Sequence, residues 1–322
     1  VAAECGCRAM AEYADLFGQI DAAVVASPTK THHAIGMDLI EHGMHVLVEK
    51  PICASVREAD ELVSAAERRG VVLQVGHVER FNPAFCEALP CAVAPKYIEV
   101  LRAAPFTFRS TDVGVVLDLM IHDLDLVLTL AKSPVRRVEA IGTAVVGRKE
   151  DVANARLEFD NGCVASLSAS RVSYLAARRM QVWTAEGFAG IDFAARSLCL
   201  VRPSETLLRR EFDLDALTAD EVAYWQETFA QEHLPCTTQS FDAVDALALE
   251  CEDFVNAVRT GRAPRVSGEA GRNALAVAEQ IVASLAEHAW NDATSGRVGP
   301  KHQVVPPPHF PLSPVAPTMR RA

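Results

Sequence analysis

The sequence predicts an α/β protein in which an incomplete doubly wound parallel sheet is followed by an α+β domain with an open, mainly antiparallel sheet. Short apolar runs alternate with helical stretches between residues 22 and 76, which is typical of parallel strands joined by crossover helices. From residue 96 to 214 apolar and polar residues alternate instead, as in antiparallel strands with one solvated face. The length of 322 residues suffices for two domains, since single cores stop growing near ~250–300 residues.

The first region contains three predicted strands, which are residues 22–26, 45–48 and 71–75. A helix is predicted over 31–42, closed by Gly43. A second helix begins at Ser55 and ends at Gly70, and Glu58 has the spacing of a capping box with Ser55. Right-handed crossovers turn this β-α-β-α-β order into half of a doubly wound sheet, whose ligands bind beyond the carboxyl ends of the strands.

Polar residues and residues of special geometry follow all three predicted strands, at 27–29, 49–51 and 76–77. We interpret Pro28 and Gly76, taken alone, as ordinary turn residues. Lys50 differs, because a lysine that directly follows a buried strand and precedes a proline needs a partner for its charge. The sequence therefore predicts a ligand site that includes Lys50 at this edge of the sheet.

The second region begins with a predicted hairpin, in which 156–159 and 165–169 flank the turn sequence Asp160-Asn161-Gly162. Further strands are predicted over 180–184, 191–193 and 198–200. Two amphipathic helices follow, one over 240–260 with the stripe Phe241, Val244, Leu247, Cys251, Phe254 and Val258, and one over 269–288 with Leu275, Ala278, Ile281 and Leu285. We place the domains at 1–94 and 95–290 and expect the Pro-rich residues 291–322 to form a disordered tail.

One predicted helix, over 113–131, is apolar nearly all round and should be buried. It nevertheless carries one polar stripe, formed by Asp118, His122, Asp125 and Thr129. Buried ionisable groups must pair with each other or face a polar cavity. A pair that merely ties the helix to the sheet is one interpretation, but a histidine with a carboxylate one turn on either side favours a functional site.

Composition excludes several classes of protein. The formal net charge of −11 argues against general nucleic-acid binding, because such a surface repels phosphate polymers. No apolar run approaches the ~20 residues that span a bilayer and no signal-peptide pattern opens the chain, so we expect a cytoplasmic protein without membrane partners. The nine cysteines contain no CxxC pair, so we expect reduced thiols and no metal site, with a redox role for Cys5 and Cys7 as a minor alternative.

Four motifs, in order along the chain, resemble the glucose–fructose oxidoreductase / inositol dehydrogenase (Gfo/Idh/MocA) family. They are Ala26-Ser27-Pro28-Thr29 with His32, Glu49-Lys50-Pro51, Val75-Gly76-His77, and the run Asp118-Leu119-Met120-Ile121-His122-Asp123. The resemblance implies an NAD- or NADP-dependent oxidoreductase with a Rossmann domain, followed by an α+β domain that binds substrate. It also implies that the chain forms a homo-oligomer.

The resemblance implies roles for individual residues. Lys50, His122 and Asp118 match the catalytic positions, and we expect hydride transfer from a carbinol carbon while His122, or else Lys50, takes the hydroxyl proton. We favour His122 as the base and Lys50 as the orienting acid. The expected cofactor contacts are Ser27, Pro28, Thr29, His32, Glu49, Lys50 and His77.

Residues 76–84 and 109–123 are similar to a narrower group, the UDP-N-acetylglucosamine 3-dehydrogenases, which oxidise the sugar-nucleotide 3-hydroxyl ahead of transamination for amide-linked lipid A. Arg80 and Arg109 are then candidates for the diphosphate, because its oxygens suit a guanidinium fork. The expected substrate contacts are Arg80, Asn82, Arg109 and Asp118. Surface ion pairing is an equally good interpretation of the two arginines.

The sequence differs from the family at its start. It contains no Gly-x-Gly-x-x-Gly turn, the turn that holds the pyrophosphate of a dinucleotide in a Rossmann domain. We expect that the first βαβ unit is missing, that the sheet has an unpaired apolar edge, and that the cofactor binds poorly. The choice between NAD and NADP is left open. A cofactor-less binding or assembly protein is one alternative, and a dehydrogenase of an inositol, a free hexose or a biliverdin-like ligand is another.

Overall fold

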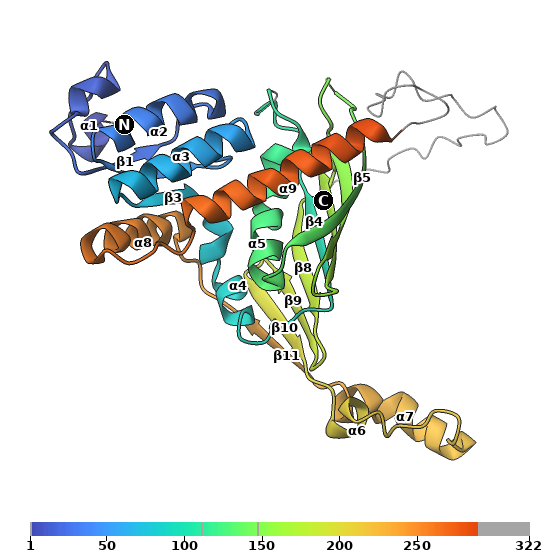
Figure 1. Cartoon of the computed structure of the whole chain (residues 1–322). Coiled ribbons are helices and arrows are strands. Elements are labelled where there is room, and N and C mark those ends of the chain that lie inside the picture. Colours follow the sequence, from blue (N-terminus) through green and yellow to red (C-terminus); the bar gives the residue numbers. More distant parts are fainter. Residues whose placement is uncertain (1, 111, 147, 289–322) are drawn as a thin grey trace, which may run out of the picture.

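The computed structural model describes residues 2–110, 112–146 and 148–288, so the predicted tail over 291–322 lies outside the described residues. The first sheet is parallel and has the order β1-β2-β3, formed by β1 (Ala22–Val25), β2 (His45–Glu49) and β3 (Leu73–Gly76). Figure 1 shows α2 (His32–Glu41) and α3 (Val56–Arg69) above this sheet and α8 (Ala246–Thr260) below it. The predicted β-α-β-α-β order is confirmed.

The two helices of the first region end as predicted, at residues with positive φ. Gly43 (φ 78°) and Gly70 (φ 65°) adopt the left-handed conformation that glycine tolerates without steric cost. At the start of α3 the Ser55 hydroxyl accepts the amide of Glu58, as expected. The Glu58 carboxylate, however, accepts the amide of Ala54 rather than that of Ser55, so the capping box is displaced by one residue.

In the described part of the chain, the second sheet has the order β11-β10-β9-β8-β4-β7-β6-β5. Its strands are β4 (Tyr97–Ala103), β5 (Val135–Thr143), β6 (Val152–Phe159), β7 (Val164–Ser170), β8 (Ala177–Trp183), β9 (Phe188–Asp192), β10 (Ser197–Val201) and β11 (Cys236–Ser240). The β4–β7 pair is parallel and the other described pairs of this sheet are antiparallel. The mainly antiparallel second sheet confirms the predicted fold class.

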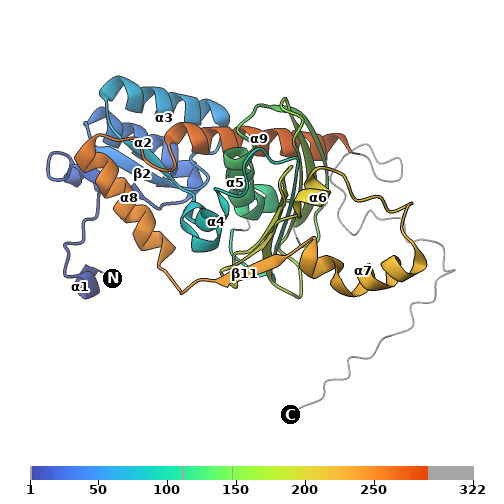
Figure 2. The ribbon, with the colours of Figure 1, turned by 90° about the horizontal axis from the view of Figure 1, so that it is seen from below.

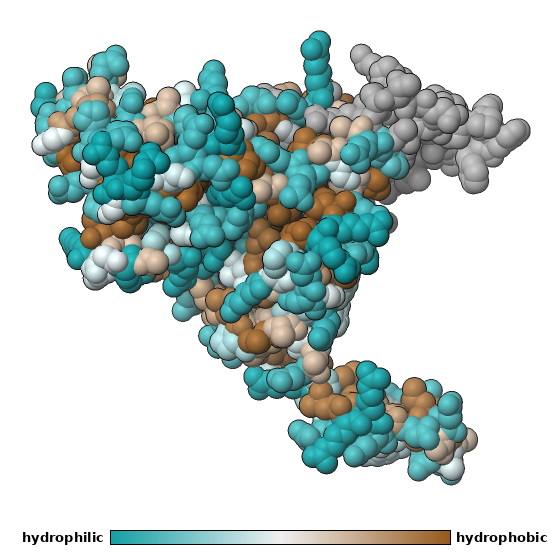
Figure 3. Space-filling view, in the orientation of Figure 1, coloured by the Kyte–Doolittle hydropathy of each residue, from teal (hydrophilic) through white to brown (hydrophobic). Residues whose placement is uncertain are grey.

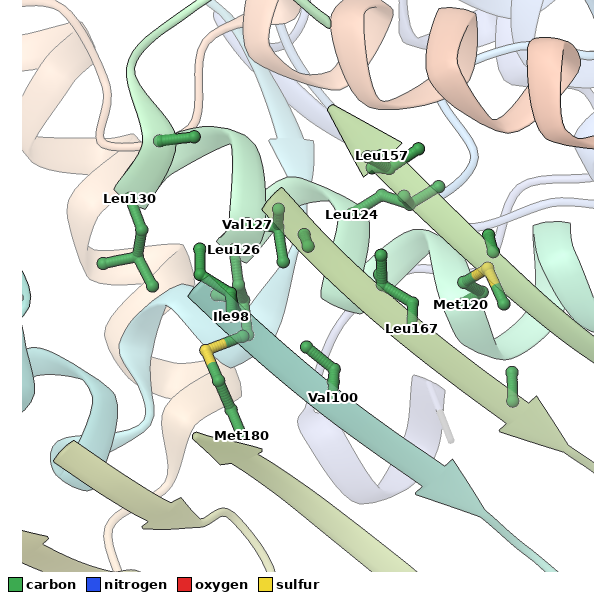
Figure 4. Close-up of a cluster of buried hydrophobic side chains, with 14 of the residues drawn as sticks. Ile98, Val100, Met120, Leu124, Leu126, Val127, Leu130, Leu157, Leu167 and Met180 are labelled. Carbon is green, nitrogen blue, oxygen red and sulfur yellow. The ribbon is translucent and has the colours of Figure 1, made fainter. Parts of the chain in front are cut away.

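A helical layer covers one face of the second sheet. Its helices are α4 (Pro83–Ala88), α5 (Ile121–Ala131) and α9 (Gly268–Glu287), and α4 and α5 lie between the two sheets in both views (Figures 1 and 2). Ile98 and Val100 of β4 meet Leu124 and Val127 of α5 in the buried cluster of Figure 4. This packing fixes α5, the helix that carries His122, against the sheet.

The predicted helix over 240–260 is wrong in its first third. Residues 236–240 form β11, which pairs with β10, and Asp245 begins α8 by accepting the amide of Ala248. Phe241 and Val244 therefore lie outside the helix, and Leu247 is half exposed. The predicted apolar stripe loses its first two members because residues 241–245 form the connection between β11 and α8, and Ser240 is the one residue of the predicted helix that belongs to the strand.

An arm that the sequence did not predict leaves β10 and returns to β11. It contains α6 (Glu205–Leu208) and α7 (Ala219–Glu232), which project away from the rest of the molecule (Figures 1 and 2). Apolar side chains are exposed on this arm, among them Leu214 and Tyr224, and Figure 3 shows apolar residues at its surface. The remaining short elements are α1 (Ala2–Cys5), η1 (Tyr13–Leu16), η2 (Thr29–Thr31), η3 (Val78–Phe81) and η4 (Val116–Met120).

Candidate active site

A cleft of about 430 Å³ opens at the carboxyl ends of β1 and β2. The first domain contributes residues 27–29, His32 and 49–51 to its lining, and the second contributes 109–110, 112–113 and 117–118. The cleft thus lies where a doubly wound sheet is expected to bind its ligands. Segments that are far apart in the sequence form its two walls.

Lys50 connects the two walls of the cleft. Its Nζ donates a hydrogen bond of 2.7 Å to the backbone oxygen of Asp118 and lies 3.7 Å from Oδ1 of the same residue. Burial lowers the pKa of Lys50 below its usual 10.5, although the charges of Asp118 and Glu49 act in the opposite direction. A partly desolvated lysine of this kind can donate to a substrate hydroxyl and can also exchange a proton.

Asp118 lies in η4, a π-helical turn that continues directly into α5. The sequence predicts a uniform α-helix here, and the wider turn changes which side chains share a face. Asp125 faces Arg80, and the Thr129 hydroxyl donates to the backbone of Asp125. The predicted polar stripe is therefore divided between two sets of partners. Among the described residues, no hydrogen bond joins His122 to the carboxylate of Asp118 or of Asp125.

Two imidazoles meet beside Asp118. His77 follows β3 and His122 lies in α5, with ring centroids 6.4 Å apart and ring planes at 87°. Burial, followed by the charges of Lys50 and Arg102, holds the pKa of His122 well below its usual 6.5, and burial also lowers the pKa of His77. Nδ1 of His122 and both ring nitrogens of His77 have no hydrogen-bond partner in the part of the chain that the structure describes. Neither ring lines the cleft itself.

An ion-pair network that sequence reasoning missed fixes both histidine-bearing segments. Arg102 of β4 is 4% exposed and donates to both oxygens of Asp123, at 2.8 and 2.7 Å. It also donates to Glu79, two residues after His77, at 3.0 Å. The alternation of Ile98, Val100 and Arg102 places this arginine on the covered face of β4, and that pattern could have identified it.

Six of the seven residues predicted to contact the cofactor line the cleft, and His77 does not. Ser27, Pro28 and Thr29 line the cleft, and Glu49 lies beside Lys50 in its wall. His32 is 1% exposed, with Nδ1 2.9 Å from the Pro51 oxygen and Nε2 2.8 Å from the Ser27 oxygen. Its ring therefore links the two loops that follow β1 and β2.

Two predicted substrate contacts lie elsewhere, whereas Arg109 and Asp118 do line the cleft. The Arg80 guanidinium pairs with both oxygens of Asp125, at 2.6 and 2.9 Å. Asn82 begins α4, where its side-chain oxygen accepts the amide of Ala84. Neither Arg80 nor Asn82 lines the cleft, and partners within the protein engage both groups, so their predicted contact with substrate stays a prediction.

The cleft fits the nicotinamide half of a dinucleotide. Hydroxyls of Ser27 and Thr29, the Glu49 carboxylate and the Lys50 ammonium supply donors and acceptors that suit a ribose and an amide. The described first sheet has no Gly-x-Gly-x-x-Gly turn to hold the pyrophosphate. Within the described residues, no helix is both long and apolar enough to cross a membrane, and no group of His, Cys, Asp and Glu could hold a metal ion.

Comparison with known proteins agrees with this geometry. Residues 1–77 match the profile of an oxidoreductase family with an NAD-binding Rossmann fold, and residues 91–189 match the GFO/IDH/MocA C-terminal domain. UDP-N-acetylglucosamine 3-dehydrogenase of Acidithiobacillus ferrooxidans is 37% identical over 87% of this chain and 84% of its own. A solved structure of that enzyme has a TM-score of 0.75 at 36% identity, covering 88% of this chain and 84% of that one. Myo-inositol 2-dehydrogenase of Thermotoga maritima is 27% identical over 83% of this chain and 78% of its own.

The fold, the cleft and these relatives define an NAD(P)-dependent dehydrogenase that acts on hydroxyl groups. The chain belongs to the Gfo/Idh/MocA oxidoreductase family.

Proposed function

We propose that this chain oxidises the 3-hydroxyl of UDP-N-acetylglucosamine, as a step in the synthesis of lipid A precursors. The observation that carries the proposal is the contact of Lys50 with Asp118 across a cleft at the carboxyl ends of β1 and β2. The 37% identical relative with this activity supports the choice of substrate. Arg109, which lines the cleft, supplies a positive charge for an anionic substrate in an otherwise acidic protein.

The chain's own residues would handle the proton. Bound NAD(P) supplies the hydride acceptor for the carbinol carbon. Lys50 orients the substrate hydroxyl by donating a hydrogen bond to its oxygen, and Asp118 accepts a hydrogen bond from the sugar. His122 lies outside the cleft lining, one turn after Asp118, and would take the hydroxyl proton of a substrate that reaches past Asp118, because its lowered pKa keeps the imidazole neutral at neutral pH. The Arg102 network holds the helix of His122 in place.

Turnover measured with NAD and with NADP tests this proposal. UDP-N-acetylglucosamine is expected to be oxidised faster than myo-inositol or a free hexose, with reduced nicotinamide as the readout. Lys50→Ala and His122→Ala are expected to abolish turnover while the melting temperature changes by no more than about 2 °C, whereas the exposed control Lys149→Ala keeps full activity.

Each other outcome has a clear meaning. Preferred turnover of myo-inositol or a hexose would replace the sugar-nucleotide assignment by that alternative. Binding of the sugar nucleotide without any turnover would favour a binding or assembly protein. Unfolding of both variants would make Lys50 and His122 structural residues and remove their proposed catalytic roles.

A further inference from the structure

The segment that carries Arg109 has an unusual backbone. Phe108 (φ 58°) and Ser110 (φ 50°) flank Arg109, and both adopt the left-handed conformation that side chains with a Cβ disfavour. A left-handed conformation at two residues with a Cβ requires that the surrounding structure hold the backbone in place. Strained backbone of this kind concentrates at functional sites. Arg109 and Ser110 also line the cleft that contains Lys50.

A buried arginine of the second sheet holds this segment. Arg171 follows β7, is 6% exposed, and donates from Nη1 to the backbone oxygens of Ser110 at 3.0 Å and Val113 at 2.8 Å. Its Nε donates to Asp151 at 2.7 Å, and Asp151 is fully buried. The positions of residues 110 and 113 are therefore fixed from behind, and they in turn place Arg109 at the cleft.

An aromatic pair precedes Arg109. The rings of Phe106 and Phe108 meet edge to face with centroids 5.0 Å apart, and the guanidinium carbon of Arg171 lies 6.0 Å from the centre of the Phe106 ring. Phe108 is 83% exposed. A large apolar ring that is held by a second ring, yet left mostly exposed by the described residues, offers a stacking surface.

The size of the cleft indicates what this surface binds. The sugar ring and the nicotinamide must both approach Lys50, and a cleft of about 430 Å³ lies near the small end of the range of roughly 300–1,000 Å³ that ligand pockets span. The remainder of a sugar nucleotide must then leave the cleft along a wall. Residues 109 and 110 form such a wall, and Phe108 directly precedes them.

We propose that residues 106–110 form the subsite for the nucleoside diphosphate half of the substrate, which rests on the function proposed above. Arg109 pairs with the diphosphate, and the nucleobase stacks on Phe108. Arg171 is a positioning residue that acts through the carbonyl groups of Ser110 and Val113. The subsite extends the substrate contacts beyond the residues that surround the reacting hydroxyl.

Titration calorimetry with UDP, which requires no turnover, tests the subsite. Phe108→Ala is expected to weaken UDP binding about tenfold, the fold-change typical of a lost base stack, whereas Phe108→Trp retains the affinity. Arg109→Ala is expected to weaken UDP binding and to reduce its dependence on salt. Tyr224→Ala, which removes an exposed aromatic ring from the arm, serves as the matched control and leaves UDP affinity unchanged.

Arg171 has a separate kinetic signature. Arg171→Met is expected to raise KM for the sugar nucleotide several-fold while kcat and the affinity for NAD(P) change little, because the reacting groups themselves are untouched. Arg171→Lys restores part of the lost affinity, since an ammonium can donate to one of the two carbonyl oxygens. Equal losses of sugar-nucleotide and NAD(P) affinity would show a general structural role and would contradict the positioning role.

UDP binding and oxidation of the sugar nucleotide test the subsite and the proposed reaction separately. Unchanged UDP affinity in Phe108→Ala overturns the subsite even when UDP-N-acetylglucosamine is oxidised. UDP binding that Phe108→Ala weakens, without oxidation of the sugar nucleotide, supports the subsite and rejects the proposed reaction. A change in oligomeric state at constant UDP affinity makes Phe108 an interface residue and also overturns the subsite.

Discussion

Burial lowers the pKa of both Lys50 and His122. Burial is the largest cause for both residues, and the charge of Lys50 is the next cause for His122. This arrangement suits a proton acceptor that must be neutral near pH 7 beside a cation that orients the substrate. The sequence contains both residues but does not reveal the effect of Lys50 on His122, because they are 72 positions apart in the chain.

The pH dependence of kcat/KM follows from the lowered pKa values of Lys50 and His122. His122 acts in its neutral form, so the acid limb is expected below pH 6.5, and Lys50 acts in its charged form, so the alkaline limb is expected below pH 10.5. Lys50→Arg keeps the positive charge and is expected to move the alkaline limb upward. An acid limb well above pH 6.5 that disappears in Lys50→Arg would instead make Lys50 the base.

Glu250 is a second buried ionisable residue, and it lies outside the cleft. It belongs to α8, is 0% exposed, and neither carboxyl oxygen has a hydrogen-bond partner among the described residues. Burial, with smaller effects from Glu49 and Asp253, raises its pKa from 4.5 to about 8. Its stabilising contribution is therefore complete below pH 4.5 and is lost as pH rises through about 8.

Glu250→Gln is expected to remove this pH dependence. At and above pH 8 the variant should be more stable than the parent by on the order of a few kcal/mol, because no buried carboxylate has to ionise. Urea unfolding followed from pH 4.5 to above 8 measures the difference. The exposed neighbour Glu252→Gln is the control, and a parallel pH profile for Glu250→Gln and the parent protein would contradict the expectation.

At the scale of elements, the junction of η4 and α5 shows how one local irregularity redistributes functional groups. Asp118 lies in the π-helical turn and contacts Lys50, whereas Asp125, seven residues later, pairs with Arg80. Regular α-helical spacing would have aligned both carboxylates with His122. The wide turn spans only five residues, too few to alter the apolar periodicity of the whole segment, so the sequence pattern predicted the helix without it.

Helix α9 belongs to both hydrophobic cores. Leu275 packs in the core of the first domain, and Ile281 and Leu285 pack in the core of the second, all of them 0% exposed. Figure 1 shows the helix running from β3 to β5. The predicted stripe on this helix is confirmed by the burial of all four of its members.

Ile281→Ala is expected to lower the free energy of unfolding by about 2–5 kcal/mol, because it leaves a cavity in the core of the second domain. Calorimetry should show one transition moving as a whole, since α9 couples the two cores. The exposed Gln280→Ala on the same helix is the control, with a change within about 0.5 kcal/mol. Two resolved transitions, with just one of them shifted, would show that the domains unfold independently.

At the scale of the whole molecule, the site depends on two sheets whose segments meet at one cleft. The first sheet presents Lys50 at the end of β2, and the second domain presents Asp118 and Arg109. Three further parts of the architecture, namely the arm with α6 and α7, strand β11 and the Arg102 network, escaped the sequence analysis. Strand β11 and the Arg102 network depend on contacts between segments distant in the chain, for which local patterns carry little information. Helix α7, in contrast, begins at a local capping box of Thr218 and Glu221, a signal that could have identified it.

The sequence by itself determined the β-α-β-α-β order of the first region and the fold class, and it predicts the grouping of Lys50, Asp118 and His122. Hydrophobic periodicity and turn residues act within a few neighbouring positions, so these signals can be read directly from the sequence. The tertiary structure alone decided which polar side chains reach the cleft. Arg80 and Asn82 carry suitable chemistry, but distant Asp125 and the start of α4 engage them, because a buried polar group takes the partner that folding places beside it.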